Sequence, residues 1–420
     1  MTDFHQEGVV TTLHALYEAF DKEEYLADLE HKLEEYSRHT KISLLLPSLY
    51  AELRNPQVLD RIMNNITQVK YLHSVVVALG GAPEEAQFRE AKAYFGKLGS
   101  SERDLKVIWV DGPLIQNIFK KLQEKEIHIG VPGKGQSVWI TLGYLLAKEE
   151  ADVIALHDCD IVTYDRLLLG RLIEPTANPN NDFEFCKGYY PRISPTERTM
   201  KGRVTRLFVT PFVDAMARIM RERGFDELNR FFSYHRTFNY PLAGEFSFTV
   251  PLARGVNIAY DWGLEVATLS EVYHRVSPRK ITQIDLIRNY EHKHQDVSPD
   301  DRNKGLHRMV VDIAKFYLNY MRSHGIPLDD AFVDMMLHTY YENTLGFIKA
   351  YSDDAEVNGL IYDRHQEELT ATYFRGFLWT AWEQSKGPHE STLIPSWNRV
   401  AYSVPEIYPQ ILDAVEADNA

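Results

Sequence analysis

The sequence has only two cysteines, Cys159 and Cys186, which cannot build a disulfide framework. A chain of 420 residues with so few thiols is typical of a reducing compartment, so we expect a cytoplasmic protein. The first residues include neither the basic nor the apolar region of a signal peptide. The longest apolar runs, around Ile42–Leu46 and Val75–Leu79, are far shorter than the roughly 20 residues that cross a membrane. No membrane partner is expected.

The chain also lacks an excess of basic residues: 46 Lys and Arg stand against 60 Asp and Glu, a formal net charge of −14. This balance argues against a general nucleic-acid binder, because attraction to phosphates needs a basic surface. One window, residues 187–206, departs from it, with a single acidic residue, Glu197. Its basic residues are Lys187, Arg192, Arg198, Lys201, Arg203 and Arg206. Such a local reversal of charge suits a small anionic substrate.

Short apolar strands alternate with helices in the first part of the chain. The predicted strands are Ile42–Leu46, Val75–Leu79, Leu105–Val110 and Asp152–Leu156. The predicted helices are Pro56–Gln68, Glu84–Phe95, Leu114–Lys125 and Gln136–Lys148. This alternation predicts an α/β fold with a mostly parallel sheet covered by helices on both faces. Ligands of such sheets bind at the carboxyl ends of the strands.

The flanking regions differ from this pattern. Residues 10–38 are predicted to be helical, and residues from about 190 to 300 to be irregular polar loops. Three long helices are expected after Pro299, over Gly305–Ser323, Leu328–Tyr351 and Glu367–Glu383. The expected divisions are an N-terminal helical extension (1–40), a catalytic domain (41–300) and a C-terminal helical region (301–420). Aromatic residues at helical spacing in the last region are typical of core or of a subunit interface, and we expect a homodimer.

Asp158-Cys159-Asp160 follows the fourth predicted strand. Two carboxylates one residue apart at a strand end can hold a divalent cation against a diphosphate. The alternative is a polar strand end with both carboxylates solvated. The same residues with Ile161 and Val162 also match the D-x-D-x-[TV] pattern of aspartate-nucleophile phosphatases. Those enzymes usually carry the nucleophile on an early strand, whereas three strands come first here, so we rank the phosphatase second.

Two further segments offer positive charge to an anion. In Gly133-Lys134-Gly135, the glycines allow close approach of the backbone and the lysine supplies a point charge, although an ordinary loop before a helix has the same pattern. Gly202-Arg203-Val204-Thr205 can present a guanidinium, a hydroxyl and backbone N–H groups to a phosphate or carboxylate. The alternative for these residues is a solvated loop whose arginines pair with nearby acidic residues.

Acidic and imidazole groups follow in the second half. Glu245 and Glu265 each come soon after a glycine, and either can accept hydrogen bonds from sugar hydroxyls or pair with an arginine. His292 and His294 can complete a metal site begun by carboxylates, although an isolated histidine pair is more often a surface feature.

Together these segments resemble nucleotide-sugar-dependent glycosyltransferases of the A-type fold, and more narrowly the retaining glucosyl-3-phosphoglycerate synthases and their mannosyl relatives. The resemblance covers about residues 41–295 and implies a Rossmann-like catalytic domain. It rests on the order and spacing of Leu45-Leu46-Pro47 with Glu52, Gly133-Lys134-Gly135, Asp158-Cys159-Asp160, Gly202-Arg203-Val204-Thr205, Pro241-Leu242-Ala243-Gly244-Glu245 and Gly263-Leu264-Glu265.

The resemblance also implies a role for each residue. Those expected at the nucleotide are Pro47, Leu49, Glu52, Lys134, Asp158 and Cys159. Those expected at the acceptor are Lys187, Gly202, Arg203, Val204 and Thr205. Those expected to be catalytic are Asp160, Glu245 and Glu265, the two glutamates lining the sugar pocket. Asp160 and His292 are expected to ligate Mg²⁺ or Mn²⁺, and His294 is close enough to replace His292.

The implied activity is metal-dependent transfer of a hexose from a nucleoside-diphosphate sugar, with UDP-glucose the expected donor and 3-phosphoglycerate the expected acceptor. The leaving phosphate would accept the proton of the acceptor's hydroxyl, so no protein nucleophile is needed. The residues do not choose between UDP and GDP, glucose and mannose, or 3-phosphoglycerate and glycerate. Outside this class, the phosphatase and a non-catalytic sugar-nucleotide sensor stay open.

Overall fold

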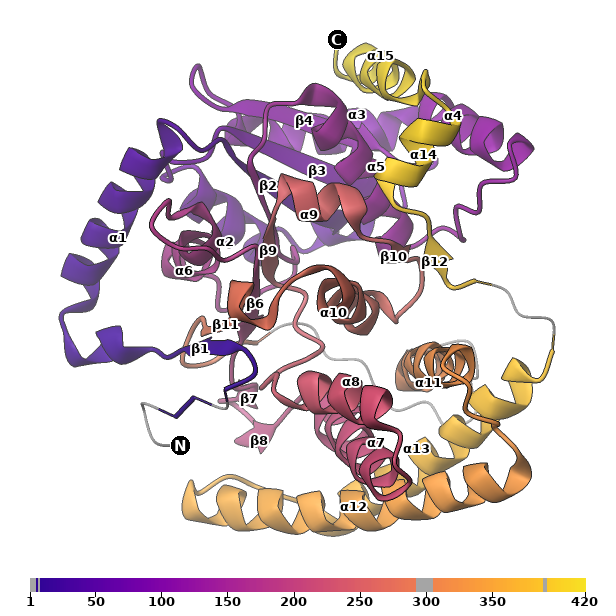
Figure 1. The fold of residues 1–420 in the computed structure, drawn as a ribbon. Coiled ribbons are helices and arrows are strands. Elements are labelled where there is room, and N and C mark those ends of the chain that lie inside the picture. The colour runs from indigo at the N-terminus through magenta and orange to yellow at the C-terminus, as the bar shows by residue number, and fades with distance from the viewer. Residues whose placement is uncertain (1–4, 7, 292–304, 388–390) are drawn as a thin grey trace.

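The computed structural model describes residues 5–6, 8–291, 305–387 and 391–420. An eight-stranded sheet forms its centre, with the spatial order β1-β11-β6-β9-β5-β2-β3-β4 (Figure 1). All of these strands run in one direction except β9, which is antiparallel to both neighbours. Their bounds are β1 (Thr11–Leu13), β2 (Ile42–Leu49), β3 (Ser74–Gly80), β4 (Asp104–Trp109), β5 (Val153–Leu156), β6 (Phe185–Tyr189), β9 (Phe246–Thr249) and β11 (Ile281–Asp285).

The predicted mostly parallel sheet with helices on both faces is confirmed. The intervening helices are α2 (Pro56–Ile66), α3 (Glu85–Phe95), α4 (Pro113–Glu124) and α5 (Lys134–Lys148). Every residue of β3 is buried, as expected of a strand covered on both faces. Alternate β3 side chains enter different hydrophobic clusters: Val76 and Ala78 pack on one face, and Val75 and Val77 on the other.

The prediction that residues 10–38 are all helical is wrong at its start. Thr11–Leu13 form β1, an edge strand parallel to β11, while α1 (Lys22–Ser37) is the helix and packs on α6 (Arg166–Ala177). Leu13 and Leu16 have helical spacing, but Leu13 belongs to β1, which gains its hydrogen bonds from a strand about 270 residues later. A partner so distant in sequence leaves no trace in local periodicity.

The prediction of irregular loops from about 190 to 300 is also wrong. This stretch contains the hairpin β7 (Ile193–Ser194) and β8 (Thr199–Met200), the strand β10 (Ile258–Ala259), and four α-helices. The helices are α7 (Thr210–Glu222), α8 (Asp226–Arg236), α9 (Val250–Gly255) and α10 (Leu264–Arg275). Pro251 stands in the first turn of α9, where proline is favoured because no helical N–H is lost. Pro211 stands near the start of α7, directly after the π-helical turn η4 (Thr205–Val209).

The predicted C-terminal helices are present as α11 (Gly305–Ser323), α12 (Asp330–Val357) and α13 (Arg364–Ser385). They share one hydrophobic cluster with α7 and α8, at the bottom of Figure 1. The chain then returns to the sheet, where β12 (Leu393–Ile394) pairs with β10. There α14 (Trp397–Ser403) places Trp397 on Trp139 of α5, with ring centroids 4.3 Å apart, and α15 (Ile407–Asn419) packs on α4, α5 and β4. The last residues thus belong to the core of the sheet domain.

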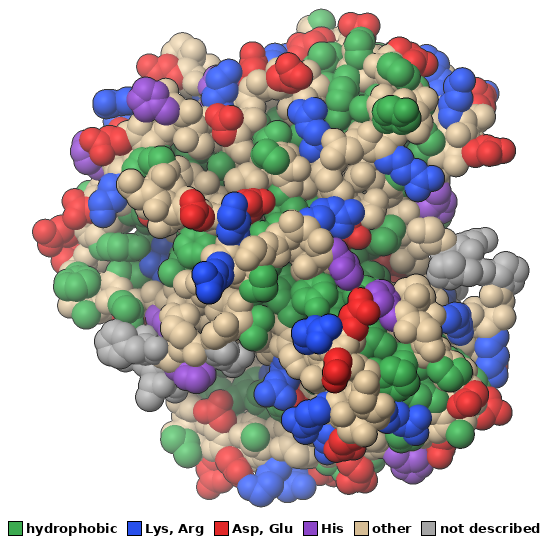
Figure 2. Space-filling model, viewed as in Figure 1, with side chains coloured by type: hydrophobic (Ala, Val, Ile, Leu, Met, Phe, Trp, Pro, Cys, Tyr) green, Lys and Arg blue, Asp and Glu red, His purple; other side chains and the backbone are tan. Residues whose placement is uncertain are grey.

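Two general features bear on the site. None of the helices in the described part of the chain has the length and apolarity needed to cross a bilayer. Figure 2 shows acidic and basic side chains interspersed over the face viewed in Figure 1, so the basic window of residues 187–206 does not produce a broad positive surface on this face.

Candidate active site

The carboxyl end of β5 brings three predicted site residues together. Asp158 follows β5, and its Oδ1 atom lies 2.7 Å from Nζ of Lys134, the first residue of α5. The same Nζ lies 3.2 Å from Oε1 of Glu265, in the first turn of α10. Lys134 and Asp158 therefore form one ion-paired cluster with Glu265, which lies more than 100 positions later in the chain. The cluster lies at the edge of the sheet where an α/β fold binds its ligands.

Glycines in the predicted motifs make this cluster possible. A Cβ atom on Gly244 would stand 2.6 Å from Oδ2 of Asp158 and 3.0 Å from Nζ of Lys134. A Cβ atom on Gly135 would stand 1.9 Å from the carbonyl oxygen of Ala259. At Gly135 only a residue without a side chain fits, because the obstacle is backbone. At Gly244 a side chain would displace the ion pair between Asp158 and Lys134.

The electrostatics of the cluster hold Lys134 charged. Burial alone would lower the pKa of Lys134, but Asp158 and Glu265 outweigh burial and raise it. For Asp160 the surroundings disfavour the charged form. Burial, and then the negative charges of Asp158 and Glu52, raise the pKa of Asp160 to about 7. The site thus contains more carboxylates than its lysine can compensate.

Two of the residues predicted for the nucleotide, Glu52 and Cys159, line a small cavity. Glu52, Cys159 and Asp160 line it together with Asn55, Val58 and Leu59, three residues around the start of α2 that the sequence did not single out. The Ser48 hydroxyl donates a 2.7 Å hydrogen bond to Glu52. Pro47 and Leu49 lie at the end of β2, the first partly buried and the second exposed. Burial raises the pKa of the Cys159 thiol well above its ordinary value, which leaves the thiol protonated and a poor nucleophile.

Glu245 is fully buried and held by two tyrosines. It accepts hydrogen bonds from the hydroxyls of Tyr190 and Tyr290, the latter at 2.6 Å, and the two rings stack with centroids 3.8 Å apart. Burial, and then the charge of Asp158, raise the pKa of Glu245. Sequence reasoning missed both tyrosines. The only available signal was that Tyr290 stands two residues before His292, which had been singled out.

His157 contacts the backbone of the Asp158-Cys159-Asp160 segment. One ring nitrogen of His157 lies 3.0 Å from the carbonyl oxygen of Asp158, and the other lies 3.0 Å from the Tyr164 hydroxyl. Burial lowers the pKa of His157 to about 4, so the imidazole is neutral at neutral pH. Sequence reasoning also missed this histidine, although it directly precedes the motif.

Lys187, the first residue of the basic window, is buried inside the protein. Its side chain is 1% exposed and donates to the carbonyl oxygen of Ala243, next to the Gly244-Glu245 pair. Burial lowers the pKa of Lys187 to about 8, opposed by the nearby charges of Glu265 and Glu245. Lys187 thus supports the loop that carries Glu245, and contact with an acceptor stays a prediction.

The expected acceptor segment is the beginning of a helix and not a loop. Gly202 has a φ of +75°, and after Arg203 and Val204 the chain forms the π-helical turn η4 (Thr205–Val209), which continues into α7. Val204 and Thr205 are buried, and the Thr205 hydroxyl has no hydrogen-bond partner among the described residues. The Arg203 side chain is 39% exposed and pairs with Glu367. The exposed guanidinium of Arg203 suits an anionic ligand. The Thr205 hydroxyl is buried, so its contact with an acceptor stays a prediction.

Of the residues predicted to bind the metal, the structure describes only Asp160. Asp160 lies in the site, but His292 and His294 fall outside the described residues. Within residues 5–6, 8–291, 305–387 and 391–420, no group of three or more His, Cys, Asp and Glu side chains is arranged to hold a metal ion.

Two curated relatives align with the whole chain. The glucosyl-3-phosphoglycerate synthase of Persephonella marina is 39% identical and covers 100% of both chains. The protein of the same name from Methanococcoides burtonii is 37% identical and covers 99% of this chain and 98% of its own. This chain belongs to the glucosyl-3-phosphoglycerate synthase family. No protein-family model matches the sequence.

A solved member of the family supports the fold. The glucosyl-3-phosphoglycerate synthase of Mycobacterium tuberculosis in complex with Mg²⁺ and uridine diphosphate is 20% identical, with a TM-score of 0.50 over 77% of this chain and 89% of that one. Its complex with phosphoglyceric acid has a TM-score of 0.50 at 18% identity, over 77% and 90%. The resemblance and the fold class expected from the sequence are confirmed, and the chain is a glycosyltransferase of this family.

In this family member, Asp261 holds the turn before Glu265. The Gly263 N–H donates a 2.8 Å hydrogen bond to Asp261 Oδ1, and α11 contributes Asp312 and Lys315 nearby. Burial, and then the charge of Asp312, raise the pKa of Asp261 to about 7, while Lys315 opposes the shift. A carboxyl whose pKa is higher in the folded state than the ordinary 3.8 destabilises the fold once it ionises. This penalty grows as the pH rises from about 4 to about 7.

Asp261→Asn is therefore expected to stabilise the protein at pH 8, by on the order of 2 kcal/mol, and to change its stability little at pH 4. The measurement is urea unfolding of both proteins at several pH values between 4 and 8. The exposed Asp182, changed to Asn, serves as the control. Parallel stability profiles for wild type and Asp261→Asn would show that Asp261 has no raised pKa.

Proposed function

We propose that this chain transfers glucose from UDP-glucose to 3-phosphoglycerate with retention of configuration, forming glucosyl-3-phosphoglycerate and UDP. Full-length relatives carry the name of this activity. The observation that carries the proposal is the cluster of Asp158, Lys134 and Glu265 at the end of β5, beside a cavity lined by Glu52 and Asp160. The groups expected at the nucleotide and at the sugar thus meet in one place.

The donor side follows from the charges. Lys134, kept protonated by its carboxylate neighbours, offers a positive charge to the diphosphate. Glu265 is 7% exposed and lies against the same lysine, so its second oxygen can accept hydrogen bonds from sugar hydroxyls. Glu245 lies fully buried behind these groups, anchored by its two tyrosines, and keeps the pocket wall rigid.

A divalent cation fits the donor set at Asp160. Carboxylate oxygens are the ligands that Mg²⁺ and Mn²⁺ prefer, and Asp160 is crowded by the negative charges of Asp158 and Glu52. Asp160 would hold the ion, with His292 the predicted second ligand. When bound, the ion neutralises the charge that develops on the leaving diphosphate.

The acceptor side is built by η4 and the residues before it. Arg203 supplies a guanidinium for the phosphate or carboxylate of 3-phosphoglycerate. The acceptor's hydroxyl then attacks the anomeric carbon on the face from which the diphosphate leaves. A phosphate oxygen of the leaving group accepts its proton, so Cys159, protonated and buried, has no part as a nucleophile.

A panel of donors and acceptors tests the proposal. UDP-glucose, GDP-glucose and GDP-mannose are each combined with 3-phosphoglycerate or glycerate, with Mg²⁺, Mn²⁺ or a chelator, and nucleotide release and product are measured. We expect the highest rate with UDP-glucose, 3-phosphoglycerate and metal. Transfer to neither acceptor from any donor would overturn the proposal. Hydrolysis of a generic phosphoester, with trapping by beryllium fluoride, would favour the phosphatase instead.

Arg203→Ala is expected to raise the KM for 3-phosphoglycerate by about 10- to 100-fold, because a charge-assisted contact to the acceptor is lost. The KM for UDP-glucose should change less than about twofold. Arg218→Ala, on the exposed face of the adjoining α7, is the matched control and should leave both constants unchanged. An equal rise in both KM values would place Arg203 outside the acceptor site.

The homodimer expected from the sequence stays a prediction. Leu369 and Trp379 on α13 are 36% and 45% exposed, and these apolar side chains are available to a second copy of the chain. By contrast Trp382, one turn further along, is buried in the helical cluster.

A further inference from the structure

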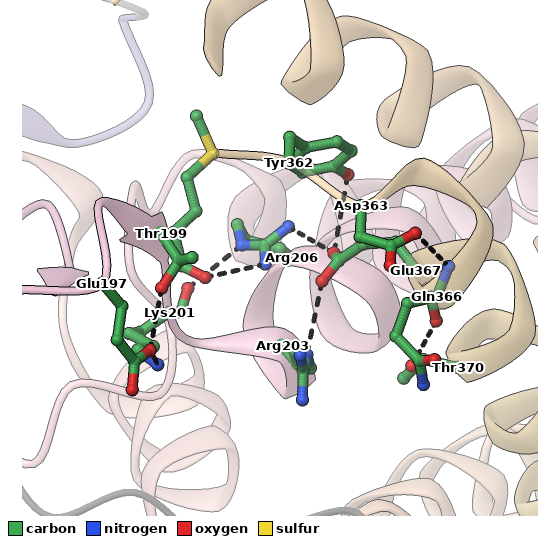
Figure 3. Close-up of polar contacts among 11 residues, drawn as sticks. Glu197, Thr199, Lys201, Arg203, Arg206, Tyr362, Asp363, Gln366, Glu367 and Thr370 are labelled. Carbon is green, nitrogen blue, oxygen red and sulfur yellow. Dashed lines mark hydrogen bonds and ion pairs between the residues drawn. The ribbon is translucent and has the colours of Figure 1, made fainter. Parts of the chain in front are cut away.

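A carboxylate from the C-terminal helices lies between two arginines of the acceptor segment. Glu367, in the first turn of α13, is 6% exposed. Its Oε2 accepts a 2.8 Å hydrogen bond from Arg206, and its Oε1 accepts one from Nε of Arg203 at 3.3 Å. Figure 3 shows Glu367 between the two guanidinium groups, with the Tyr362 hydroxyl 3.5 Å from the same carboxylate. One carboxylate facing two guanidiniums leaves this cluster with a surplus positive charge.

The two arginines use their donors differently. Arg206 is almost fully buried, and all three of its guanidinium nitrogens donate hydrogen bonds within the protein. The acceptors are Glu367 and the carbonyl oxygens of Lys201 and Met200. Arg203 is partly exposed, and in the part of the chain that the structure describes only its Nε is engaged, by Glu367. The terminal nitrogens of Arg203, which form the fork that binds a phosphate or carboxylate, are left for a ligand.

The backbone around Glu367 is fastened to the same segment. The Ile361 N–H donates a 2.7 Å hydrogen bond to the carbonyl oxygen of Arg198, and the Arg198 guanidinium donates to the carbonyl oxygen of Gly359. The link between α12 and α13 thus lies against the β7–β8 hairpin that precedes Gly202. In addition, the ring of Tyr351 on α12 lies 5.1 Å from the Arg206 guanidinium. The C-terminal helices therefore brace the acceptor segment at several points.

We infer that Glu367 is a positioning residue for the acceptor, which holds Arg203 by Nε so that its two terminal nitrogens meet the acceptor's anionic group already oriented. The inference rests on the proposed function, since it takes Arg203 as an acceptor contact. Without Glu367, the flexible Arg203 side chain must be ordered by the acceptor itself, which weakens binding. The C-terminal helical region thereby contributes to the specificity of the catalytic domain.

Glu367→Gln tests this in the full-length protein, because it keeps the size of the side chain and removes the charge. We expect the KM for 3-phosphoglycerate to rise by about tenfold, with kcat and the KM for UDP-glucose changed less than about twofold. The control is Glu368→Gln, which removes the neighbouring, partly exposed carboxylate paired with Arg364. A purely structural loss would reduce the amount of folded enzyme, and so the maximal rate, without shifting KM.

The double variant Arg203→Ala/Glu367→Gln separates the outcomes. If Glu367 acts through Arg203, the KM for 3-phosphoglycerate of the double variant equals that of Arg203→Ala alone. A further tenfold rise in the double variant would overturn the inference, and so would a Glu367→Gln enzyme that behaves like Glu368→Gln. An unchanged KM in Arg203→Ala would overturn the proposed acceptor site and the inference with it. Should Glu367→Gln not fold, Glu367→Asp, which retracts the charge by one methylene group, is expected to give a smaller rise confined to the acceptor KM.

Discussion

Asp160→Ala is expected to lower kcat/KM by at least about 1000-fold while leaving the fold intact. Asp160 is the carboxylate that would hold the cation against the diphosphate, and the two described carboxylates whose charges act on it most strongly each have a partner of their own. Asp158 is engaged by Lys134, and Glu52 accepts from Ser48. Because Asp160 is crowded by like charges, its removal should not destabilise the protein.

Three measurements test the role of Asp160. Transfer to 3-phosphoglycerate is assayed with Mg²⁺ and with Mn²⁺, and thermal unfolding is followed without metal. Asp160→Asn, which keeps the shape and loses the charge, should be nearly as inactive as Asp160→Ala, whereas Asp182→Ala in an exposed loop should be fully active. Wild-type activity in Asp160→Ala with either metal would exclude Asp160 as the metal ligand.

Lys134→Met is expected to lower kcat/KM by about 100-fold, mainly through a higher KM for UDP-glucose. The substitution removes the positive charge offered to the diphosphate. It also takes away the positive charge that Asp158 and Glu265 now share at 2.7 and 3.2 Å, which leaves an excess of negative charge where the anionic donor is proposed to bind. Loss of attraction and gain of repulsion act in the same direction.

Lys148→Met is the matched control, because Lys148 is the last residue of the same helix α5 and lies away from the carboxylate cluster. Its kinetic constants should equal those of the wild type. Binding of UDP, measured by titration calorimetry without acceptor, should weaken in Lys134→Met and not in Lys148→Met. Unchanged UDP binding in Lys134→Met would mean that Lys134 only orders the carboxylates and does not contact the nucleotide.

The elements that could be predicted are those whose signal is local. The strands β2 to β5 and the helices between them were expected within a few residues, because each is an apolar run or a periodic segment bounded by Gly, Pro or polar residues. The short strand β1 could not be predicted, since its stability comes from pairing with β11 and not from its own three residues. The helices α7 to α10 were missed because prolines and glycines, typical of loops, stand within their first residues or shortly before them.

The same distinction applies to the site. The Asp158-Cys159-Asp160 segment, Lys134 and Glu265 could be singled out because charged residues follow apolar strands or glycines at recognisable spacings. Tyr190 and Tyr290, the two anchors of Glu245, carry no such pattern, since each is one of 24 tyrosines. Glu367 lies in a predicted helix among ordinary charged residues, and only folding places it against Arg203.

The sequence by itself determined the kind of fold and the chemistry available: a mostly parallel sheet, carboxylates at a strand end, a lysine between glycines, and a basic segment in an acidic chain. Only the tertiary structure decided which of these groups meet. Lys134 bridges Asp158 and Glu265, Lys187 turns inward against the loop that carries Glu245, and Arg203 is held by a helix more than 160 residues away. The physical reason is that ion pairs and burial depend on distance in space, and local sequence patterns report only on neighbours along the chain.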